Sequence, residues 1–368
     1  MKIAFSIIIA IHGLIHLMGF VKGFGLANVP GLVQPISRPL GAVWLVASLL
    51  ILTSVVGMYA FPRWWWAVGI LASLVSQGVI LTSWSDAKVG TIGNMLLLIG
   101  ALYGFFAEGP MSFRAEFRRA VDQEIDRRYE PRLLEEADLA HLPPALQKYV
   151  RRSGAVGQPR VYNFQASFKG RIRSGPSARW MDFTVTQLNR VADPKRLFLM
   201  KASMFGVPFD VFHQYEGSSA LMRVRLASAI LVTDARGPEM YQSETVTVLN
   251  DFCVLAPGAL PFLDIQWEVI DDHKIKGTYS NSGQTVSAVL DFNESGDLVN
   301  FSSDDRLFSS KDGKSFTPAR WETPLSDYLE FSGHVVARLG TAMWKTPTGD
   351  FVYGEFNLQD IQYNVRES

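Results

Sequence analysis

The hydrophobic positions of this 368-residue chain are concentrated in its first third. Four uncharged apolar runs follow one another with short breaks, at residues 3–21, 41–61, 64–84 and 90–107. Each is about 18–21 residues long, close to the length that a helix needs to cross the hydrocarbon core of a bilayer. A core helix of a soluble protein is usually shorter and has a polar face. The pattern therefore predicts a bundle of four transmembrane helices within residues 1–109.

A short amphipathic region follows this bundle. Residues 112–128 have the period of a helix with one apolar face, which could lie on the membrane surface or pack on the domain that follows. A second helix is predicted to begin at Pro143 and Pro144 and to end at Gly154. Residues 110–158 therefore form an amphipathic linker and a helix.

From residue 160 the period changes to two. Between residues 161 and 173 apolar side chains occupy the even positions and polar ones the odd positions, as in a half-buried strand. Turn residues recur at short intervals, which predicts about a dozen antiparallel strands over residues 159–368. One helix interrupts them, and we expect it to begin at Ser243 and to run to Pro257.

A long antiparallel sheet must cover one of its faces. The predicted fold is therefore a membrane α-helical bundle followed by an α+β domain, whose curved sheet forms a half-barrel or open barrel on one or two helices. Such a sheet encloses an apolar concavity.

Charge and cysteine content narrow the function classes. The chain carries 35 basic and 35 acidic residues, but this balance averages an almost uncharged first third with a polar remainder. The lone Cys253 excludes an intramolecular disulfide framework and any site with several cysteine ligands, and its place on an apolar helix stripe indicates an inert thiol. No long basic run indicates a nucleic-acid partner. The sequence predicts no cofactor.

Orientation is predicted from the charges that flank the spans. Lys2, Arg63 and the arginines of residues 114–128 lie on one side, and only Lys22, Arg38 and Lys88 lie on the other. The positive-inside rule then places the large domain in the cytoplasm, on the inner membrane of a bacterium.

A few polar residues fall inside the apolar runs. His12 and His16 are four residues apart and share a helix face, while Gln77 and Asn94 lie in the third and fourth runs. Polar groups in a membrane usually face the bundle interior. They could form a small site with His12 and His16 as metal or haem ligands, or they could hydrogen-bond across helices. We favour the second interpretation because a histidine pair without an acidic or thiolate partner is a poor metal site.

The main candidate for catalytic chemistry is Asp304, Asp305 and Arg306, which we expect late in a strand over residues 298–308. Alternation would place Asp305 on the face opposite to Asp304 and Arg306. If Asp305 points inward, its carboxylate must be paired, so a perturbed pKa is expected here. The alternative is a cross-strand ion pair at a strand end.

Aromatic side chains are frequent in the predicted strands. Most should belong to an ordinary core, but a curved sheet could also use them to line a pocket for a hydrophobic ligand. The candidate ligand-binding residues are Trp180, Phe183, Phe301, Trp321, Tyr328 and Trp344.

Short motifs along nearly the whole chain resemble a bacterial family of unknown function. They are His12-Gly13-Leu14-Ile15-His16, Trp84-Ser85-Asp86-Ala87-Lys88, Gly90-Thr91-Ile92-Gly93-Asn94, Leu142-Pro143-Pro144, Trp180-Met181, Asn250-Asp251-Phe252-Cys253, Ser303-Asp304-Asp305-Arg306, Trp321-Glu322-Thr323-Pro324 and Tyr363-Asn364. The resemblance implies no activity or catalytic residue. The predicted β-domain also resembles the half-barrel of bacterial lipoprotein carriers, which are extracytoplasmic, in conflict with the charge bias; this is an analogy of fold.

Three functions agree with these patterns. The first is a membrane-tethered binding protein for a lipid or other hydrophobic molecule, held in the concavity of the β-domain beside the bilayer. The second is a membrane-associated hydrolase or transferase that uses Asp304, Asp305 and Arg306. The third is a sensor or scaffold that recruits a protein partner.

Overall fold

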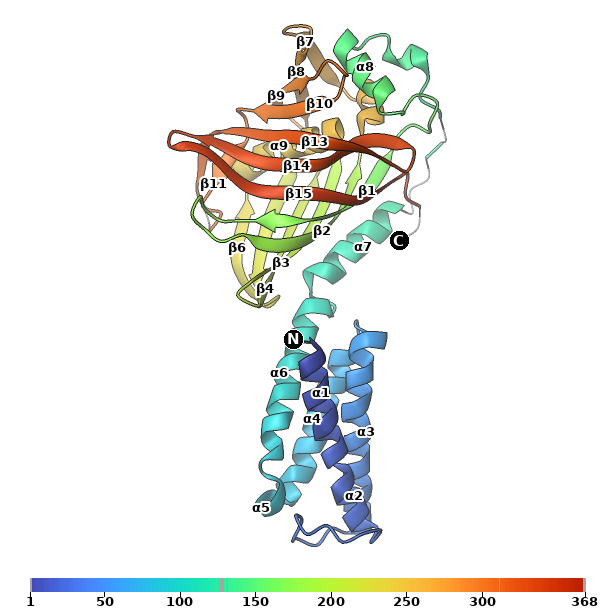
Figure 1. Ribbon diagram of the computed structural model, residues 1–368, viewed down its shortest axis with the longest axis vertical. Helices are drawn as coiled ribbons and strands as arrows, with labels where there is room; N and C mark the ends of the chain where they lie inside the picture. Colours follow the sequence, from blue (N-terminus) through green and yellow to red (C-terminus); the bar gives the residue numbers. More distant parts are fainter. Residues whose placement is uncertain (1, 126–128, 131, 311, 367–368) are drawn as a thin grey trace. The chain divides into compact units, whose positions relative to one another are not determined.

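The computed structural model describes residues 2–125, 129–130, 132–310 and 312–366 (Figure 1). It divides into two compact units, Met1–Glu116 and Phe117–Ser368. Arg127 and Arg128, which contribute to the predicted orientation, lie outside the described residues.

The first unit is a helical bundle. Its helices are α1 (Lys2–Ile15), α2 (Leu17–Gly23), α3 (Arg38–Ala60), α4 (Trp65–Thr82), α5 (Trp84–Ala87) and α6 (Gly90–Glu108). Four helical segments are long and apolar enough to cross a membrane, and α1 together with α2 forms the first of them. Large apolar side chains such as Ile3, Leu74 and Ile99 are exposed on the bundle, which is expected of surfaces that face lipid.

The first span has a break that the sequence pattern did not predict. The Nδ1 atom of His16 is 2.9 Å from the carbonyl oxygen of His12. The backbone N–H of His16 donates instead to the carbonyl of Gly13. In a regular helix the backbone N–H of His16 would donate to the carbonyl of His12. Here the imidazole of His16 bonds to that carbonyl instead, and α1 and α2 are separated at His16.

The second unit consists of one large sheet, several helices and a small two-stranded ribbon. The helices are α7 (Phe113–Ile125, which begins in the first unit), η1 (Glu136–Leu139), α8 (Pro144–Arg152), α9 (Pro238–Leu255) and η2 (Pro257–Phe262). The strands are β1 (Asn163–Ile172), β2 (Met181–Arg190), β3 (Lys195–Met204), β4 (Val207–Glu216), β5 (Ser219–Leu226), β6 (Ile230–Arg236), β7 (Ile265–Val269), β8 (Lys274–Asn281), β9 (Gln284–Phe292), β10 (Leu298–Ser303), β11 (Leu307–Ser309), β12 (Phe316–Pro318), β13 (Arg320–Phe331), β14 (His334–Thr346) and β15 (Gly349–Tyr363).

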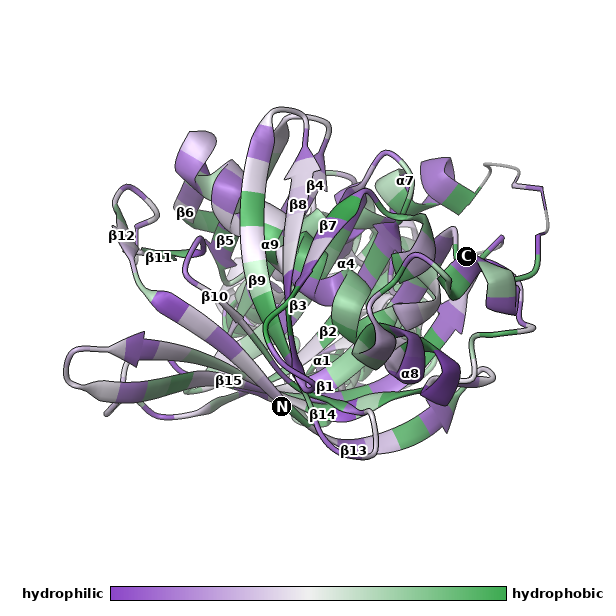
Figure 2. Ribbon diagram, turned by 90° about the horizontal axis from the view of Figure 1, so that it is seen from above, coloured by the Kyte–Doolittle hydropathy of each residue, from purple (hydrophilic) through white to green (hydrophobic). Residues whose placement is uncertain are grey.

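The described strands form a 13-stranded antiparallel sheet in the order β6-β5-β4-β3-β2-β1-β15-β14-β13-β10-β9-β8-β7, with β11 and β12 apart from it. β1 pairs with β15, so the first and last strands of the domain join its two halves. Buried and partly exposed residues alternate along strands such as β9, as Figure 2 shows in its alternating hydropathy. The sheet is curved and stays open, which confirms the predicted half-barrel architecture.

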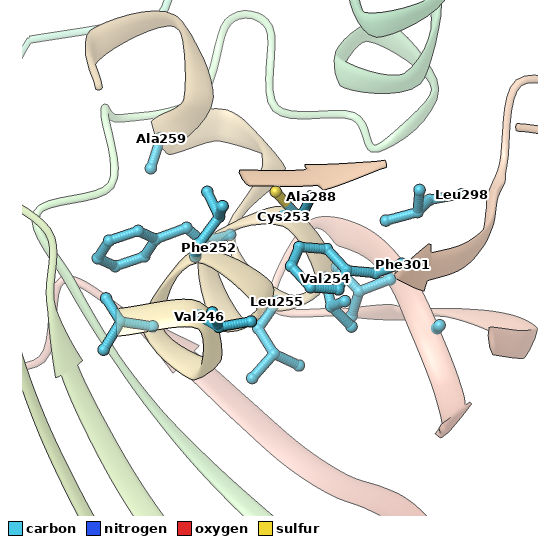
Figure 3. Packing of buried hydrophobic residues seen from close by; sticks show 14 of the residues in the cluster. Val246, Phe252, Cys253, Val254, Leu255, Ala259, Ala288, Leu298 and Phe301 are labelled. Atoms are coloured by element: carbon cyan, nitrogen blue, oxygen red, sulfur yellow. The ribbon is translucent and has the colours of Figure 1, made fainter. Parts of the chain in front are cut away.

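Helix α9 provides the cover that the sheet requires. It connects the two edge strands β6 and β7 and contacts strands from both halves of the sheet. Apolar side chains project from α9 on several sides. Val246, Phe252 and Leu255 are examples (Figure 3). Nearly every residue from Met240 to Leu255 is buried, so α9 is a central helix surrounded by its own domain.

The start of α9 differs from the prediction. It begins at Pro238, after Gly237, whose φ of +98° suits glycine. Ser243 lies inside the helix, where its Oγ atom accepts a hydrogen bond from the backbone N–H of Leu307. Ser243 therefore connects β11 to α9 through this hydrogen bond and does not cap the helix.

The C-terminal half of α7 packs on the β-domain. Its residues Phe117, Val121 and Ile125 are buried. Glu124 accepts hydrogen bonds from Arg190 and Lys195 at 2.5 and 2.8 Å, and all three side chains are buried. These contacts agree with the linker helix that packs on the following domain.

Candidate ligand cavity and its polar wall

The concavity of the sheet holds a cavity of about 780 Å³. Most of its wall is apolar and comes from β1, β3, β4, β5, β13, β14, β15 and α9. The apolar lining residues include Phe168, Phe198, Met200, Phe209, Val211, Met222, Val254, Trp321, Leu325, Trp344, Phe351 and Phe356. The ribbon β11–β12 adds Phe308 and Phe316.

Small residues on β14 keep part of this space open. Ala337, Gly340 and Ala342 line the cavity. A Cβ atom on Gly340 would meet only side-chain atoms of Leu325 and Thr323, at 3.5 and 4.0 Å. The volume therefore depends on these small side chains as well as on the curvature of the sheet.

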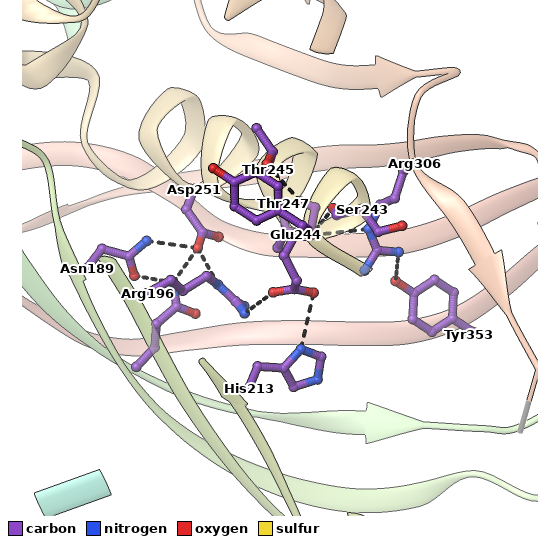
Figure 4. A network of polar contacts seen from close by, with 12 residues as sticks. Asn189, Arg196, His213, Ser243, Glu244, Thr245, Thr247, Asp251, Arg306 and Tyr353 are labelled. Atoms are coloured by element: carbon purple, nitrogen blue, oxygen red, sulfur yellow. Dashed lines mark hydrogen bonds and ion pairs between the residues drawn. The ribbon is translucent and has the colours of Figure 1, made fainter. Parts of the chain in front are cut away.

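One part of the wall is charged. Arg196 on β3 donates to Glu244 at 3.0 Å and to Asp251 at 2.7 Å, and both acids lie on α9 (Figure 4). The Nδ1 atom of His213 on β4 is 3.1 Å from the second oxygen of Glu244. Because Glu244 and Asp251 are seven residues apart, they share one face of α9 and reach the same guanidinium group.

Amide side chains complete the partners of Asp251. Gln187 and Asn189, both on β2, donate to the same carboxylate oxygen at 2.7 and 3.0 Å. Burial raises the pKa of Asp251 despite these donors and Arg196. Burial would also raise the pKa of Glu244, but His213 and Arg196 outweigh it and lower that pKa to about 2.

The second cation in this wall is Arg306, in the connection between β10 and β11. Its guanidinium lies over the rings of Trp321 and Trp344, 4.4 and 5.3 Å from their centroids. It donates to the hydroxyl groups of Thr247 and Tyr353 at 3.2 and 3.3 Å (Figure 4).

The charged wall lies within a region that a family model recognises. The model, described as a family of unknown function (DUF6544), matches residues 132–356. The chain belongs to DUF6544. The matched residues contain the lining of the cavity, so the cavity is part of what this DUF6544 domain builds.

Two solved structures are similar in fold to this DUF6544 chain. A DUF1329 family protein from Desulfovibrio piger is 15% identical and aligns over 61% of this chain and 93% of its own length, with a TM-score of 0.36. A LolA superfamily protein from Nitrosomonas europaea is 12% identical and aligns over 60% and 91%, with a TM-score of 0.28. These likenesses concern the fold alone. No curated protein sequence matches the chain.

The DUF6544 structure separates the three residues of the candidate catalytic cluster. The strand expected over residues 298–308 is interrupted after Ser303, so the alternation does not continue through it. Asp304 is 72% exposed and lies 3.8 Å from Arg320, while Asp305 accepts hydrogen bonds from the backbone and hydroxyl of Ser287. Arg306 lines the cavity, and neither carboxylate does.

The candidate ligand-binding aromatic residues are divided in the same way. Trp321 and Trp344 line the cavity. Phe183 packs against Phe356, and Phe301 packs edge-on against Trp321 in the core behind the lining. Trp180 and Tyr328 also lie outside the lining.

Those two have other contacts. Trp180 precedes β2 and is covered by Arg171 and Arg173. The hydroxyl of Tyr328 donates to the carbonyl of Leu298 at 2.6 Å. Cys253 is buried in the core, and burial raises the pKa of its thiol, as expected of an inert cysteine.

In the helical unit, the candidate polar residues do meet. The Nε2 atom of His12 is 2.9 Å from Asn94 Oδ1, and Ser76 Oγ is 2.7 Å from the same oxygen and 2.6 Å from His16 Nε2. Gln77 accepts from Asn94 at 2.9 Å. These side chains come from different helices, so the contacts are hydrogen bonds across helices.

The sequence pattern pointed to Arg306 but to no other charged residue of this wall. Arg196, His213 and Glu244 are not among the predicted site residues, and Asp251 appears only within the motif Asn250-Asp251-Phe252-Cys253. The signal was available in two places: an arginine on the same strand face as Phe198 and Met200, and two acids seven apart on a largely apolar helix.

Proposed function

We propose that the β-domain of this membrane-anchored chain binds a lipid or other hydrophobic molecule in its cavity. The observation that supports this proposal is the cavity itself, an apolar space of about 780 Å³ inside the curved sheet. Sites for small ligands have volumes of roughly 300–1,000 Å³ and are mostly apolar with a few polar groups. The charged wall supplies such groups.

The spans suggest where the ligand comes from. Four helices long and apolar enough to cross a membrane precede the β-domain. A domain held beside a bilayer could exchange an amphiphile with it, and the anchor would limit the distance over which the ligand travels. The charge bias of the flanks supports a cytoplasmic position for this domain. Labelling of an introduced surface cysteine with a membrane-impermeant maleimide tests that position.

The catalytic alternative depended on two carboxylates close together at the cavity. Asp304 and Asp305 do not line it and have separate partners. Binding is therefore the function that the geometry supports better.

Photo-cross-linking tests the proposal directly. The full-length protein, exchanged from detergent into amphipol, would be illuminated with a fatty acid that carries a diazirine on its chain. Within the β-domain we expect adducts at lining residues such as Met200, Met222 and Trp344, and none at Trp180 or Tyr328, which lie outside the lining. Adducts spread evenly over the exposed surface of the β-domain would overturn the proposal.

A further inference from the structure

Four arginines line the cavity, and their partners differ. Arg196 is paired with Glu244 and Asp251, and Arg338 is paired with Asp327. Arg173 donates to the carbonyl oxygens of Val352 and Pro176. Arg306 donates to two hydroxyl groups, and no carboxylate lies within ion-pair distance of it among the described residues.

A guanidinium group in an apolar wall requires compensation for lost hydration. The rings of Trp321 and Trp344 give Arg306 part of it through cation–π attraction. Hydroxyl acceptors are neutral and leave the charge itself without a counterion in direct contact. An anion beside Arg306 would form a charge-assisted hydrogen bond, which is stronger than either bond to a hydroxyl group.

Tyr353 provides a second donor at the same place. Its hydroxyl oxygen accepts from Arg306 at 3.3 Å and from the indole N–H of Trp321 at 3.1 Å. A phenol oxygen that already receives two N–H groups must direct its own hydrogen elsewhere. Tyr353 lines the cavity, so its O–H and the guanidinium of Arg306 can serve one acceptor together.

The neighbouring acids are already paired. Glu244 contacts Arg196 and His213, and Asp251 contacts Arg196 and two amide groups. Their hydrogen bonds are thus directed away from Arg306, although the negative charge of Glu244 still acts on Arg306 through space.

We propose that Arg306 and Tyr353 bind the anionic head group of the ligand, a carboxylate or a phosphate monoester, while its apolar chain occupies the cavity. This inference rests on the proposed function and specifies its ligand class. It predicts a single-headed anionic amphiphile, with the apolar lining selecting the chain and the two donors selecting the charge.

Three ligands of equal chain length distinguish the contribution of the head group to the binding affinity from that of the chain. Decanoate, decyl phosphate and decanol would be titrated calorimetrically into the full-length protein in amphipol. We expect at least one of the anions to bind more tightly than decanol by about tenfold to a hundredfold, the effect of one or two hydrogen bonds to a charged group. Inorganic phosphate alone should bind far more weakly, because it lacks the chain.

Variants assign this preference to residues. Arg306→Gln should remove the preference for the anion over decanol, Arg306→Lys should retain part of this preference, and Tyr353→Phe should reduce it a fewfold. Arg338→Gln is the matched control, because Arg338 lines the same cavity but is paired with Asp327. Near-ultraviolet circular dichroism verifies that each variant is folded.

The outcomes separate the two proposals. Equal binding of all three ligands to the wild type, or an unchanged preference in folded Arg306→Gln, would overturn the head-group site and leave the cavity function standing. Tight binding of inorganic phosphate would also overturn it, in favour of a simple anion site. If none of the three amphiphiles binds, the proposed function fails as well.

Discussion

Polar side chains are buried in both units of this chain, but their chemistry differs. In the helical unit, imidazole, amide and hydroxyl groups of His12, His16, Ser76 and Asn94 bond to one another. In the β-domain, Arg196 lies between two carboxylates in the wall of a cavity. The first network joins neighbouring helices and includes His16, where the first span is broken, whereas the second places charges beside a space that can hold a ligand.

The two networks also differ in the free energy that is lost when one partner is removed. Hydrogen bonds between transmembrane helices contribute about 0.6 kcal/mol on average, because a separated helix also finds partners. A buried charge that loses its partner has no such alternative and destabilises by about 3–5 kcal/mol. The two networks should therefore respond very differently to the loss of one member.

The largest effect is expected for Glu244→Gln. The amide nitrogen of glutamine would face one of the N–H donors of Arg196 and His213, and Arg196 would lose one of its two carboxylates. We expect the free energy of unfolding of the β-domain to fall by about 3–5 kcal/mol. Chemical unfolding followed by near-ultraviolet circular dichroism measures it, and a loss below about 1 kcal/mol would show that the network is not needed for stability.

Acid should remove the same contribution. The pKa of Glu244 is lowered from 4.5 to about 2 in the folded domain. A carboxyl group with a depressed pKa stabilises the fold above its unfolded pKa, and this stabilisation disappears as the pH falls through the folded pKa. The stability advantage of the wild type over Glu244→Gln should therefore shrink between pH 4.5 and about pH 2.

Comparison with the variant cancels the contributions of groups far from Glu244. Besides burial, the charge of Glu244 is one cause of the raised pKa of Asp251, so the measured difference includes this coupling between the two acids. An advantage that stays constant over this pH range would contradict the assignment of the charge to Glu244.

A smaller effect is expected in the helical unit. Asn94→Leu removes the group that bonds to His12, Ser76 and Gln77. At about 0.6 kcal/mol for each of these three hydrogen bonds, we expect a loss of about 1.8 kcal/mol in unfolding of the bundle by sodium dodecyl sulfate. A loss as large as that of Glu244→Gln, or a change in the ligand bound by the β-domain, would remove the distinction between the two networks.

The sequence pattern was sufficient where structure follows from local periodicity. The apolar run at residues 41–61 corresponds to α3 (Arg38–Ala60), and the predicted helix at Pro143 and Pro144 is α8 (Pro144–Arg152). In both cases the helix is determined by neighbouring residues, through an uninterrupted apolar face or a proline in the first turn.

Prediction failed where the structure depends on contacts between residues that are far apart in the sequence. Arg196 meets Glu244 and Asp251 across 48 and 55 positions of sequence, and no local pattern states which charges will be paired. The prediction of one continuous strand over residues 298–308 was wrong for a related reason. The chain bends after Ser303, and Asp305 turns to the backbone of Ser287, so alternation along the strand no longer predicts direction.

Ligand binding in the cavity is tested most directly by counting the bound molecules. Small molecules would be extracted from the full-length wild-type protein and from Gly340→Leu, in which a leucine side chain occupies cavity space, and quantified by mass spectrometry. Thr341→Leu, at the next position of β14 and outside the lining, is the matched control. We expect about one anionic amphiphile per chain for the wild type and for Thr341→Leu, and a strongly reduced amount for Gly340→Leu. Equal amounts in all three proteins, or no defined amphiphile in the wild type, would contradict this expectation.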